Sequence, residues 1–346
     1  MPNVAAQRPG FRPERLARLA ANATRRCGLD LSGLTVFTEA ASGAYAVTPV
    51  LAALAGARRV LALARASAYG TVEQITEHVA LVAEVAGMAG RVEIVHAKRA
   101  DIVAEADIIT NSGHVRPIDA EMVSWMKPTA VVPLMYEAWE FRAADVDVAA
   151  CRERGIALAG TNEQHPAVEV FSYLGLMAIR LLMDAGIAIR GSHIVVWCDN
   201  PFRPFLEEGL TRAGAVVESC ESLESIPEFS EADAVLVAVR PGNQTAVGHA
   251  EAQIIAQHYP HAVVAQFWGD LDRSELAKQG VPFWPIESPG PGHQGILPSE
   301  VGAEPVVRLQ AGGLKVGAVM ARARRLGDAE EAMAAAVASG FAQCLS

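Results

Sequence analysis

Two side chains that could exchange protons lie six residues apart in a segment rich in proline and glycine. Glu287 and His293 stand within Pro282–Pro298, which cannot form a helix or a central strand. A carboxylate beside an imidazole raises the imidazole pKa and fixes its tautomer, as in an acid–base pair. A loop histidine bonded to the backbone is an equally good interpretation. Glu287 and His293 are therefore the candidate catalytic residues, with that alternative left open.

Polar side chains also follow several segments that are predicted to be strands. In an open α/β sheet the ligand binds beyond the carboxyl ends of the strands, so these loops are where a substrate is expected. After the strand Leu34–Thr38 the residues are small and precede a helix whose free N–H groups could hold an anion. Turns and helix caps, for example at Asn162 or Asp119, are the alternative interpretation. The candidate substrate-binding residues are Ser42, Gly43, Arg65, Ser67, Tyr69, Asn111, Ser112, Glu137, Asn162 and His165.

The loop after the predicted strand Arg59–Ala64 bears on the choice of cofactor. NAD-binding folds hold the adenosine ribose there with Asp or Glu, and this loop has neither. Arg65 with Ser67 would suit a phosphate, which indicates NADP or a phosphorylated substrate. A surface arginine with no ligand explains the same residues.

The second half of the chain has a strand end that departs from the dinucleotide-binding pattern. Val195–Pro204 stands where G-x-G-x-x-G is expected, but it contains no glycine, and Pro201 and Pro204 remove N–H donors. An ordinary pyrophosphate grip is therefore not expected there. The candidate cofactor-binding residues, all at predicted strand ends or the following helix, are Asp199, Asn200, Arg203, Arg240, Trp268 and Asp270.

Alanine-rich helical periodicity alternates with short β-branched runs through most of the chain, a pattern typical of βα units and parallel sheets. We predict an α/β protein with two Rossmann-like lobes joined by a long interdomain helix, about Ala167 to Ala185. Residues 1–165 would form an N-terminal Rossmann- or flavodoxin-like lobe and 166–189 the connection. Residues 190–305 would form the second lobe, and 306–346 helices that pack back on the first.

The composition describes a soluble globular protein with 51% hydrophobic residues and a net charge of −10. This charge argues against a nucleic-acid partner. The densest basic cluster, Arg322, Arg324 and Arg325, is interpreted as a solvated helix face. The sequence contains neither a secretory signal nor an apolar run of membrane-spanning length, so we expect a cytoplasmic protein with no membrane partner. Five scattered cysteines and nine scattered histidines show no ligand spacing, so no metal is expected.

With these positions established, the chain resembles the D-2-hydroxyacid dehydrogenase superfamily, including its formate and glycerate dehydrogenase branches, and more loosely adenosylhomocysteinase. The resemblance spans about Ala106 to Gly295. Its motifs, in order, are Ala106-Asp107, Met126-Lys127-Pro128, Val146-Asp147, Arg154-Gly155-Ile156, Val168-Glu169 and Arg190-Gly191.

The resemblance implies an NAD- or NADP-dependent enzyme that dimerises through its nucleotide lobe. It also implies that His293 moves the proton with Glu287 as its partner. The family's substrate-anchoring arginine is replaced by Trp268, which leaves Arg240 or Arg203 as substitutes.

Three functions follow as expectations. The first is an NAD(P)-linked oxidoreductase that acts on a small polar molecule between the lobes. The second is a non-redox enzyme on the same scaffold, such as an S-adenosylmethionine-dependent methyltransferase, a hydrolase or a lyase, which the missing glycine loop favours. The third is a binding protein without catalytic activity.

Overall fold

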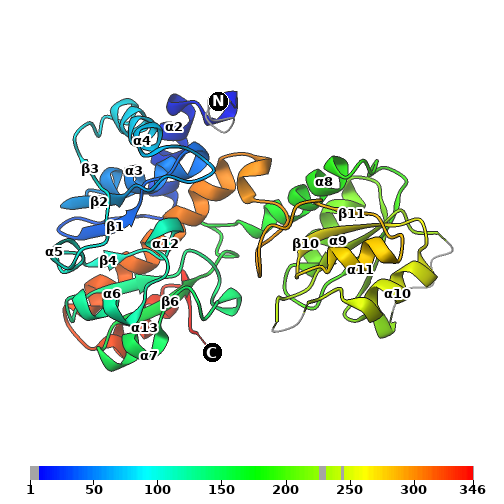
Figure 1. Ribbon diagram of the computed structural model, residues 1–346. Coiled ribbons are helices and arrows are strands. Elements are labelled where there is room, and N and C mark those ends of the chain that lie inside the picture. Colours follow the sequence, from blue (N-terminus) through cyan, green and yellow to red (C-terminus); the bar gives the residue numbers. More distant parts are fainter. Residues whose placement is uncertain (1–7, 226–230, 243–244, 346) are drawn as a thin grey trace. The chain divides into compact units, whose positions relative to one another are not determined.

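The computed structural model describes residues 8–225, 231–242 and 245–345. It divides the chain into two compact units (Figure 1). Unit 1 combines the N-terminal part up to Val170 with the C-terminal part from Gly302, and unit 2 is the continuous segment Phe171–Val301. Sequence patterns had suggested boundaries near residues 165, 189 and 305. The predicted α/β class, with two Rossmann-like units built on parallel sheets, is confirmed.

The seven-stranded sheet of unit 1 has the strand order of a dinucleotide-binding fold. From one edge the order is β3-β2-β1-β4-β5-β6, all parallel, and β12 adds an antiparallel edge strand. Chain order therefore reverses between β1 and β4, and this switch point is where such sheets bind ligands. The strands are β1 Thr35–Glu39, β2 Arg59–Leu63, β3 Val92–Val95, β4 Ile108–Ile109, β5 Val131–Pro133, β6 Ala157–Thr161 and β12 Ala342–Gln343.

Helices cover both faces of this sheet (Figure 1). Apolar residues of α2, α3, α4, α12 and α13 form the core on one face, and those of α5, α6 and α7 form the core on the other. Gly317 lets α12 approach the sheet, because a Cβ there would lie 2.8 Å from Ile108 Cγ2. The helices are α2 Pro13–Arg26, α3 Val47–Leu54, α4 Val72–Val85, α5 Ala100–Val103, α6 Ala120–Trp125, α7 Val148–Glu153, α12 Glu304–Arg324 and α13 Ala329–Ala338, with 3-10 turns at Pro9–Phe11, Gly43–Ala46, Gly113–Val115 and Ala138–Glu140.

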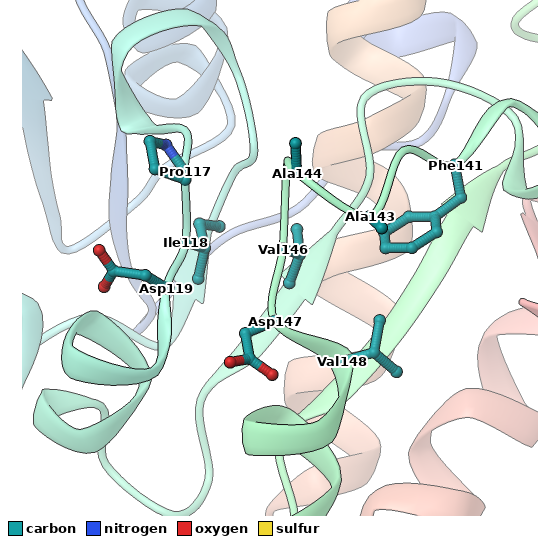
Figure 2. A pocket seen from close by; sticks show the side chains of 9 residues that line it. All are labelled: Pro117, Ile118, Asp119, Phe141, Ala143, Ala144, Val146, Asp147 and Val148. Carbon is teal, nitrogen blue, oxygen red and sulfur yellow. The ribbon is translucent and has the colours of Figure 1, made fainter. Parts of the chain in front are cut away.

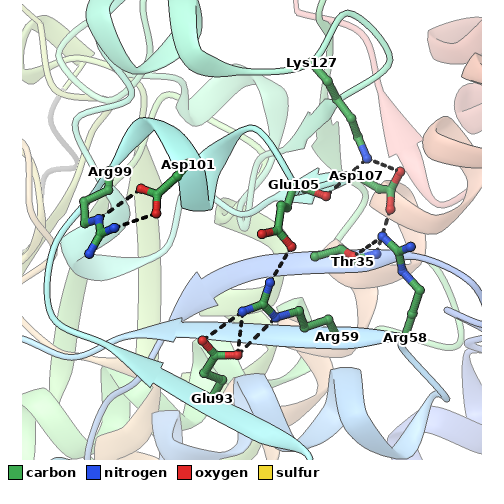
Figure 3. Close-up of polar contacts among 9 residues, drawn as sticks. All are labelled: Thr35, Arg58, Arg59, Glu93, Arg99, Asp101, Glu105, Asp107 and Lys127. Carbon is green, nitrogen blue, oxygen red and sulfur yellow. Dashed lines mark hydrogen bonds and ion pairs between the residues drawn. The ribbon is translucent and has the colours of Figure 1, made fainter.

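Ion pairs and hydrogen bonds occupy the amino edge of the same sheet (Figure 3). Asp107 accepts hydrogen bonds from the Thr35 N–H at 2.7 Å and from Lys127 Nζ at 2.6 Å. Arg59 pairs with Glu93 at 2.8 Å and also with Glu105. These contacts join strands β1, β2, β3 and β4 at the end opposite the switch point. We therefore assign them to the fold rather than to a ligand.

Unit 2 is a smaller parallel sheet in the order β8-β7-β9-β10-β11. This is the flavodoxin-like order, whose switch point lies between β7 and β9. The apolar core of one face includes residues of α10 and α11, while α8 and α9 pack against each other. The elements are α8 Leu174–Asp184, β7 His193–Trp197, α9 Arg203–Arg212, β8 Val216–Cys220, β9 Ala234–Ala238, α10 His249–His258, β10 Val263–Trp268, α11 Arg273–Lys278 and β11 Phe283–Trp284, with 3-10 turns at Phe171–Tyr173, Leu223–Ser225 and Pro298–Val301.

The long helix expected over Ala167–Ala185 is shorter than predicted. Only Leu174–Asp184 is α-helical, and it belongs to unit 2. Upstream, Glu169 has a left-handed backbone with φ of 50° and forms ion pairs with Arg26 at 2.5 Å and Arg308 at 2.8 Å. A left-handed residue ends helical geometry, so the helix cannot begin before this point.

The basic cluster on α12 is not merely a solvated face, as the sequence had indicated. Arg322 pairs with Asp30 at 2.7 Å, and Arg325 donates to the Gly33 carbonyl at 3.0 Å. Arg324 donates to the carbonyls of Gly155 and Pro128. These guanidinium groups attach the C-terminal helix to loops of unit 1, because each provides several donors for carbonyl groups that the loops leave exposed.

Candidate functional site

Glu39 lies at the switch point of unit 1. It is the last residue of β1, and its Oε1 accepts the backbone N–H of His114, after β4, at 3.3 Å. Gly113 leaves the space for this carboxyl group, since a Cβ there would lie 1.7 Å from Glu39 Oε1. Gly113 also has a φ of 40°, a conformation that suits glycine. A carboxyl group of the chain therefore lies where the strand order reverses.

The surroundings of Glu39 favour its protonated form. Burial raises the pKa of Glu39 to about 7, and the His114 N–H and the charge of Arg116 only partly oppose this shift. The residue nevertheless keeps some exposed surface. A carboxyl group with a pKa near neutrality is suited to both donating and accepting a proton.

The loop between β1 and α3, which the sequence suggested as an anion site, forms hydrogen bonds within unit 1. The Gly43 N–H donates to His78 Nδ1 at 3.2 Å, and Ser42 Oγ donates to the Tyr69 carbonyl at 2.9 Å. The predicted donor at Gly43 is thus already used within unit 1. Burial lowers the pKa of His78, which favours the neutral ring that accepts this bond.

Asn111 lies deeply buried after β4, with an exposed fraction of 1%. Its Oδ1 accepts the Met135 N–H at 2.8 Å, which fixes the orientation of the amide, and its Nδ2 has no hydrogen-bond partner among the described residues. Ser112 Oγ lies 2.7 Å from Thr110 Oγ1, within a buried hydroxyl cluster. A buried donor without a partner is costly, so Asn111 Nδ2 is a position at which an acceptor atom of a ligand would be stabilised.

Two further buried carboxyl groups lie after β5 and β6. Glu137 Oε1 accepts the Glu163 N–H at 2.9 Å, and Trp139 Nε1 donates to Glu137 Oε2. Burial raises the pKa of Glu137, and burial together with the charges of Glu140 and Glu137 raises the pKa of Glu163. Glu137 was predicted as a substrate-binding residue, but both its oxygens already accept hydrogen bonds within unit 1.

The remaining predicted substrate-binding residues of unit 1 either form contacts within the unit or are exposed to solvent. Asn162 Nδ2 donates to the Gly340 carbonyl at 2.9 Å, and His165 stacks on Phe341 with ring centroids 3.8 Å apart. Both residues therefore fasten the C-terminal segment to the sheet. Arg65, Ser67 and Tyr69 are exposed on the loop after β2, where Ser67 Oγ accepts the Tyr69 N–H at 3.1 Å.

A cavity of about 420 Å³ lies on the same unit, between the loops that precede α6 and α7. Figure 2 shows Pro117, Ile118 and Asp119 on one side, facing residues of the segment Phe141–Val148. Its lining is mostly apolar. Asp119 and Asp147 are the acidic members, and each uses Oδ1 to cap the helix that follows it.

At the switch point of unit 2, as in unit 1, a carboxylate of the protein bonds to the backbone of the neighbouring strand-end loop. Asp199, after β7, accepts the backbone N–H of Arg240, after β9, at 2.9 Å. Asn200 donates to the Ala238 carbonyl at 2.6 Å, and Arg203 pairs with Glu207 at 2.8 Å. The predicted cofactor residues Asp199, Asn200 and Arg240 therefore meet at this edge, but they bind one another.

Trp268 and Asp270, also predicted to bind the cofactor, hold the proline- and glycine-rich loop. Trp268 Nε1 donates to the Gly292 carbonyl at 3.1 Å, and Asp270 accepts the Gly292 N–H at 2.9 Å. Arg273 donates to the carbonyls of Pro285 and Glu287 in the same loop. These contacts fix the backbone of the segment that contains both predicted catalytic residues.

The described residues show no hydrogen bond or ion pair between Glu287 and His293. Both side chains are exposed, and His293 Nδ1 donates instead to the Pro291 carbonyl at 3.0 Å. This is the backbone-bonded alternative that the sequence left open. Their role as an acid–base pair stays a prediction.

The residues present do not fit a dinucleotide held in the ordinary way. A pyrophosphate needs free N–H groups and glycines at the switch point. Unit 1 places Glu39 there and uses the Gly43 N–H for His78, and unit 2 places Asp199 there beside Pro201. At both positions, side chains of the protein already accept a backbone N–H group that could otherwise bind the pyrophosphate.

Solved structures of known proteins have a similar fold. The A chain of dipicolinate synthase from Bacillus subtilis matches with a TM-score of 0.51 and 10% identity, over 83% of this chain and 96% of that one. Its counterpart from Bacillus halodurans matches at 0.49 and 12%, over 82% and 96%. The NAD+-bound 3-phosphoglycerate dehydrogenase of Entamoeba histolytica matches at 0.45 and 10%, over 82% and 93%.

These likenesses establish the fold alone. The chain has a two-unit α/β architecture with Rossmann-like parallel sheets, similar in fold to the dipicolinate synthase A chain. The two matches below 0.5 add nothing to this assignment, and S-adenosylmethionine gains no support from any of the three. No family model matches the sequence. No curated protein matches it either. Among the described residues, no helix combines the length and hydropathy needed to cross a membrane.

Several residues of this edge were not selected from the sequence. At the carboxyl edge of the unit 1 sheet, the residues that sequence reasoning missed are Glu39, Tyr45, His78, Lys98, His114, Arg116 and Glu163. Glu39 directly follows the predicted strand Leu34–Thr38, which was a usable signal. Lys98 and Arg116 carried no such signal, because only the strand order brings their loops together.

Proposed function

We propose that this chain is a small-molecule enzyme that transfers a proton to or from its substrate at the carboxyl edge of the unit 1 sheet. Glu39 is the proton-exchanging residue. The observation that carries the proposal is a carboxyl group at the switch point whose pKa is raised by burial to about 7, on a residue that keeps some exposed surface. This corresponds to a lyase or hydrolase on a dehydrogenase-like scaffold.

Two features of unit 1 favour a second candidate, an NAD(P)-linked oxidoreductase. Its strand order is that of dinucleotide-binding folds, and Arg65 follows β2, where the ribose 2′-phosphate of NADP is held in such folds. The two switch points count against this candidate, because in each of them a side chain of the protein accepts a backbone N–H group that could bind a pyrophosphate.

Proton exchange with solvent tests the first candidate without knowledge of the full reaction. The protein is incubated in D2O with a panel of small carboxylic acids and phosphate esters, and loss of C–H signals is followed by 1H NMR. We expect exchange with at least one compound, slowed about a hundredfold or more by Glu39→Gln, since general acid–base catalysis supplies factors of that order. Glu84→Gln, an exposed carboxylate on α4, is the matched control.

Calorimetry with NAD, NADP and their reduced forms separates the two candidates. Weak or absent binding supports the first. Tight binding of NADP, followed by its reduction with a panel compound, supports the second and refutes the first. Unchanged exchange in Glu39→Gln also refutes the first.

The homodimer, the cytoplasmic location and the absence of a nucleic-acid partner stay predictions. Sedimentation analysis of the purified protein measures the first. A His293→Ala variant that kept full turnover would rule out the assignment of His293 and Glu287 as an acid–base pair.

A further inference from the structure

Basic side chains from three separate loops lie at the carboxyl edge of the unit 1 sheet. Arg65 follows β2, Lys98 follows β3, and His114 and Arg116 follow β4. The strands lie in the order β3-β2-β1-β4, so the loops share one edge. The charges are therefore collected by topology from segments far apart in the chain.

Hydrogen bonds fix these loops beside one another. The Ala64 N–H donates to the Val95 carbonyl at 2.9 Å, which places the Arg65 loop next to the chain leading to Lys98. Lys98 Nζ in turn donates to the Pro117 carbonyl at 2.7 Å, next to Arg116 in the chain. His114 lies beside Glu39 through its backbone N–H.

The electrostatic effects agree with this geometry. Burial first, and then the charges of Arg65 and Arg116, lower the pKa of His114. Burial also lowers the pKa of Lys98, where Asp119 opposes the shift and Arg65 adds to it. Such effects act at short range.

Apart from Glu39, the acidic side chains near these basic residues already bind other groups of unit 1. Asp145 pairs with Arg116 at 3.2 Å and with Arg142 at 3.1 Å and accepts the Tyr136 hydroxyl. Asp119 caps α6. Among the described residues Arg65 and Lys98 form no ion pair. Arg65 and Lys98 therefore lie without an ion-pair partner on the strand-end edge that also carries Glu39 and the unpaired Asn111 Nδ2.

We infer that Arg65, Lys98 and His114 form a subsite that binds a compact oxyanion of the substrate, either a phosphate or a carboxylate group. The inference rests on the proposed function, which it deepens by naming the substrate class: a small anionic molecule whose reacting atom lies near Glu39. The guanidinium and ammonium groups supply charge-assisted donors for the oxyanion.

Titration calorimetry of the full chain with inorganic phosphate and with succinate tests the subsite. We expect saturable binding of at least one probe, weakened about tenfold or more by either Arg65→Ala or Lys98→Ala and falling with added salt. Arg99→Ala is the matched control, because Arg99 is the exposed neighbour of Lys98 and is paired with Asp101. It should leave binding within about twofold of the wild type.

The binding results distinguish the possible substrate classes and test the subsite itself. Phosphate alone indicates a phosphate ester as substrate, succinate alone a carboxylic acid, and both a shared oxyanion site. No binding of either probe, or wild-type affinity in the folded Arg65→Ala/Lys98→Ala double variant, overturns the inference. If the wild type binds a probe but exchanges no proton with any compound of the panel, the proposed function is refuted and the subsite stands. Glu39→Gln should keep probe binding.

Discussion

At the level of single residues, Glu39 couples the candidate site to the stability of unit 1. Its folded-state pKa of about 7 lies above the ordinary 4.5 of a glutamic acid. The folded state thus binds this proton more tightly than the unfolded state does. The resulting stabilisation is fully present below about pH 4.5, declines as the pH rises to about 7, and is absent above that.

Glu39→Gln should therefore change stability in a pH-dependent way. Near pH 8 we expect the variant to be more stable than the wild type by about 2–3 kcal/mol, because it removes an unfavourably buried charge. Near pH 4 the two proteins should agree within about 0.5 kcal/mol, since the wild-type carboxyl group is then neutral. Urea unfolding at both pH values measures this difference. A variant less stable than the wild type at the higher pH would contradict it.

At the level of elements, the crossing of α8 and α9 depends on two glycines that face each other. A Cβ on Gly209 would lie 2.5 Å from Gly175 Cα, and one on Gly175 would lie 2.7 Å from Gly209 Cα. Backbone atoms cannot move aside as a side chain can. The two helices can therefore pack this closely only while both positions lack a side chain.

Gly209→Ala should destabilise unit 2 although alanine favours helices. The steric conflict costs about 1–3 kcal/mol, against a helix-propensity gain of at most about 1 kcal/mol. Gly242→Ala, where a Cβ would meet nothing within 4 Å, is the control and should have little effect. Thermal unfolding of both variants makes the comparison. A stabilised Gly209→Ala would show that the helices can separate without cost.

At the level of the whole molecule, unit 1 is assembled from two segments that are distant in the sequence. The C-terminal helix α12 contributes buried residues, among them Val307, Leu314 and Met320, to the core that also contains Leu16 and Val50. Unit 2, by contrast, is one continuous segment with its own sheet and core.

Fragments should show this asymmetry. Residues 171–301 expressed alone should fold cooperatively, because their core is complete. Residues 1–170 alone should lack a cooperative transition, and adding residues 302–346 in trans should restore one. Circular dichroism during heating follows all three samples. Cooperative unfolding of 1–170 alone would show that α12 is dispensable for the core.

Local patterns in the sequence predicted the secondary-structure class and the positions of most strands, since β-branched runs and helical periodicity depend on neighbouring residues. Local patterns did not predict features that depend on contacts between segments distant in the chain. The helix expected from Ala167 begins at Leu174, after Glu169 pairs with residues from both ends of the chain. Glu287 and His293 were paired from proximity in sequence; among the described residues His293 Nδ1 bonds to the Pro291 carbonyl, and the acid–base role of the two residues stays a prediction.

The sequence by itself determined the α/β alternation, the charge balance, the missing glycine loop and the polar character of the strand ends. The tertiary structure alone decided which strand ends meet. Glu39 reaches the backbone of Gly113 and His114, and Lys98 reaches Pro117, because strand order is set by packing between segments distant in the chain. No local pattern encodes that order, so the site could be named only after the sheet was assembled.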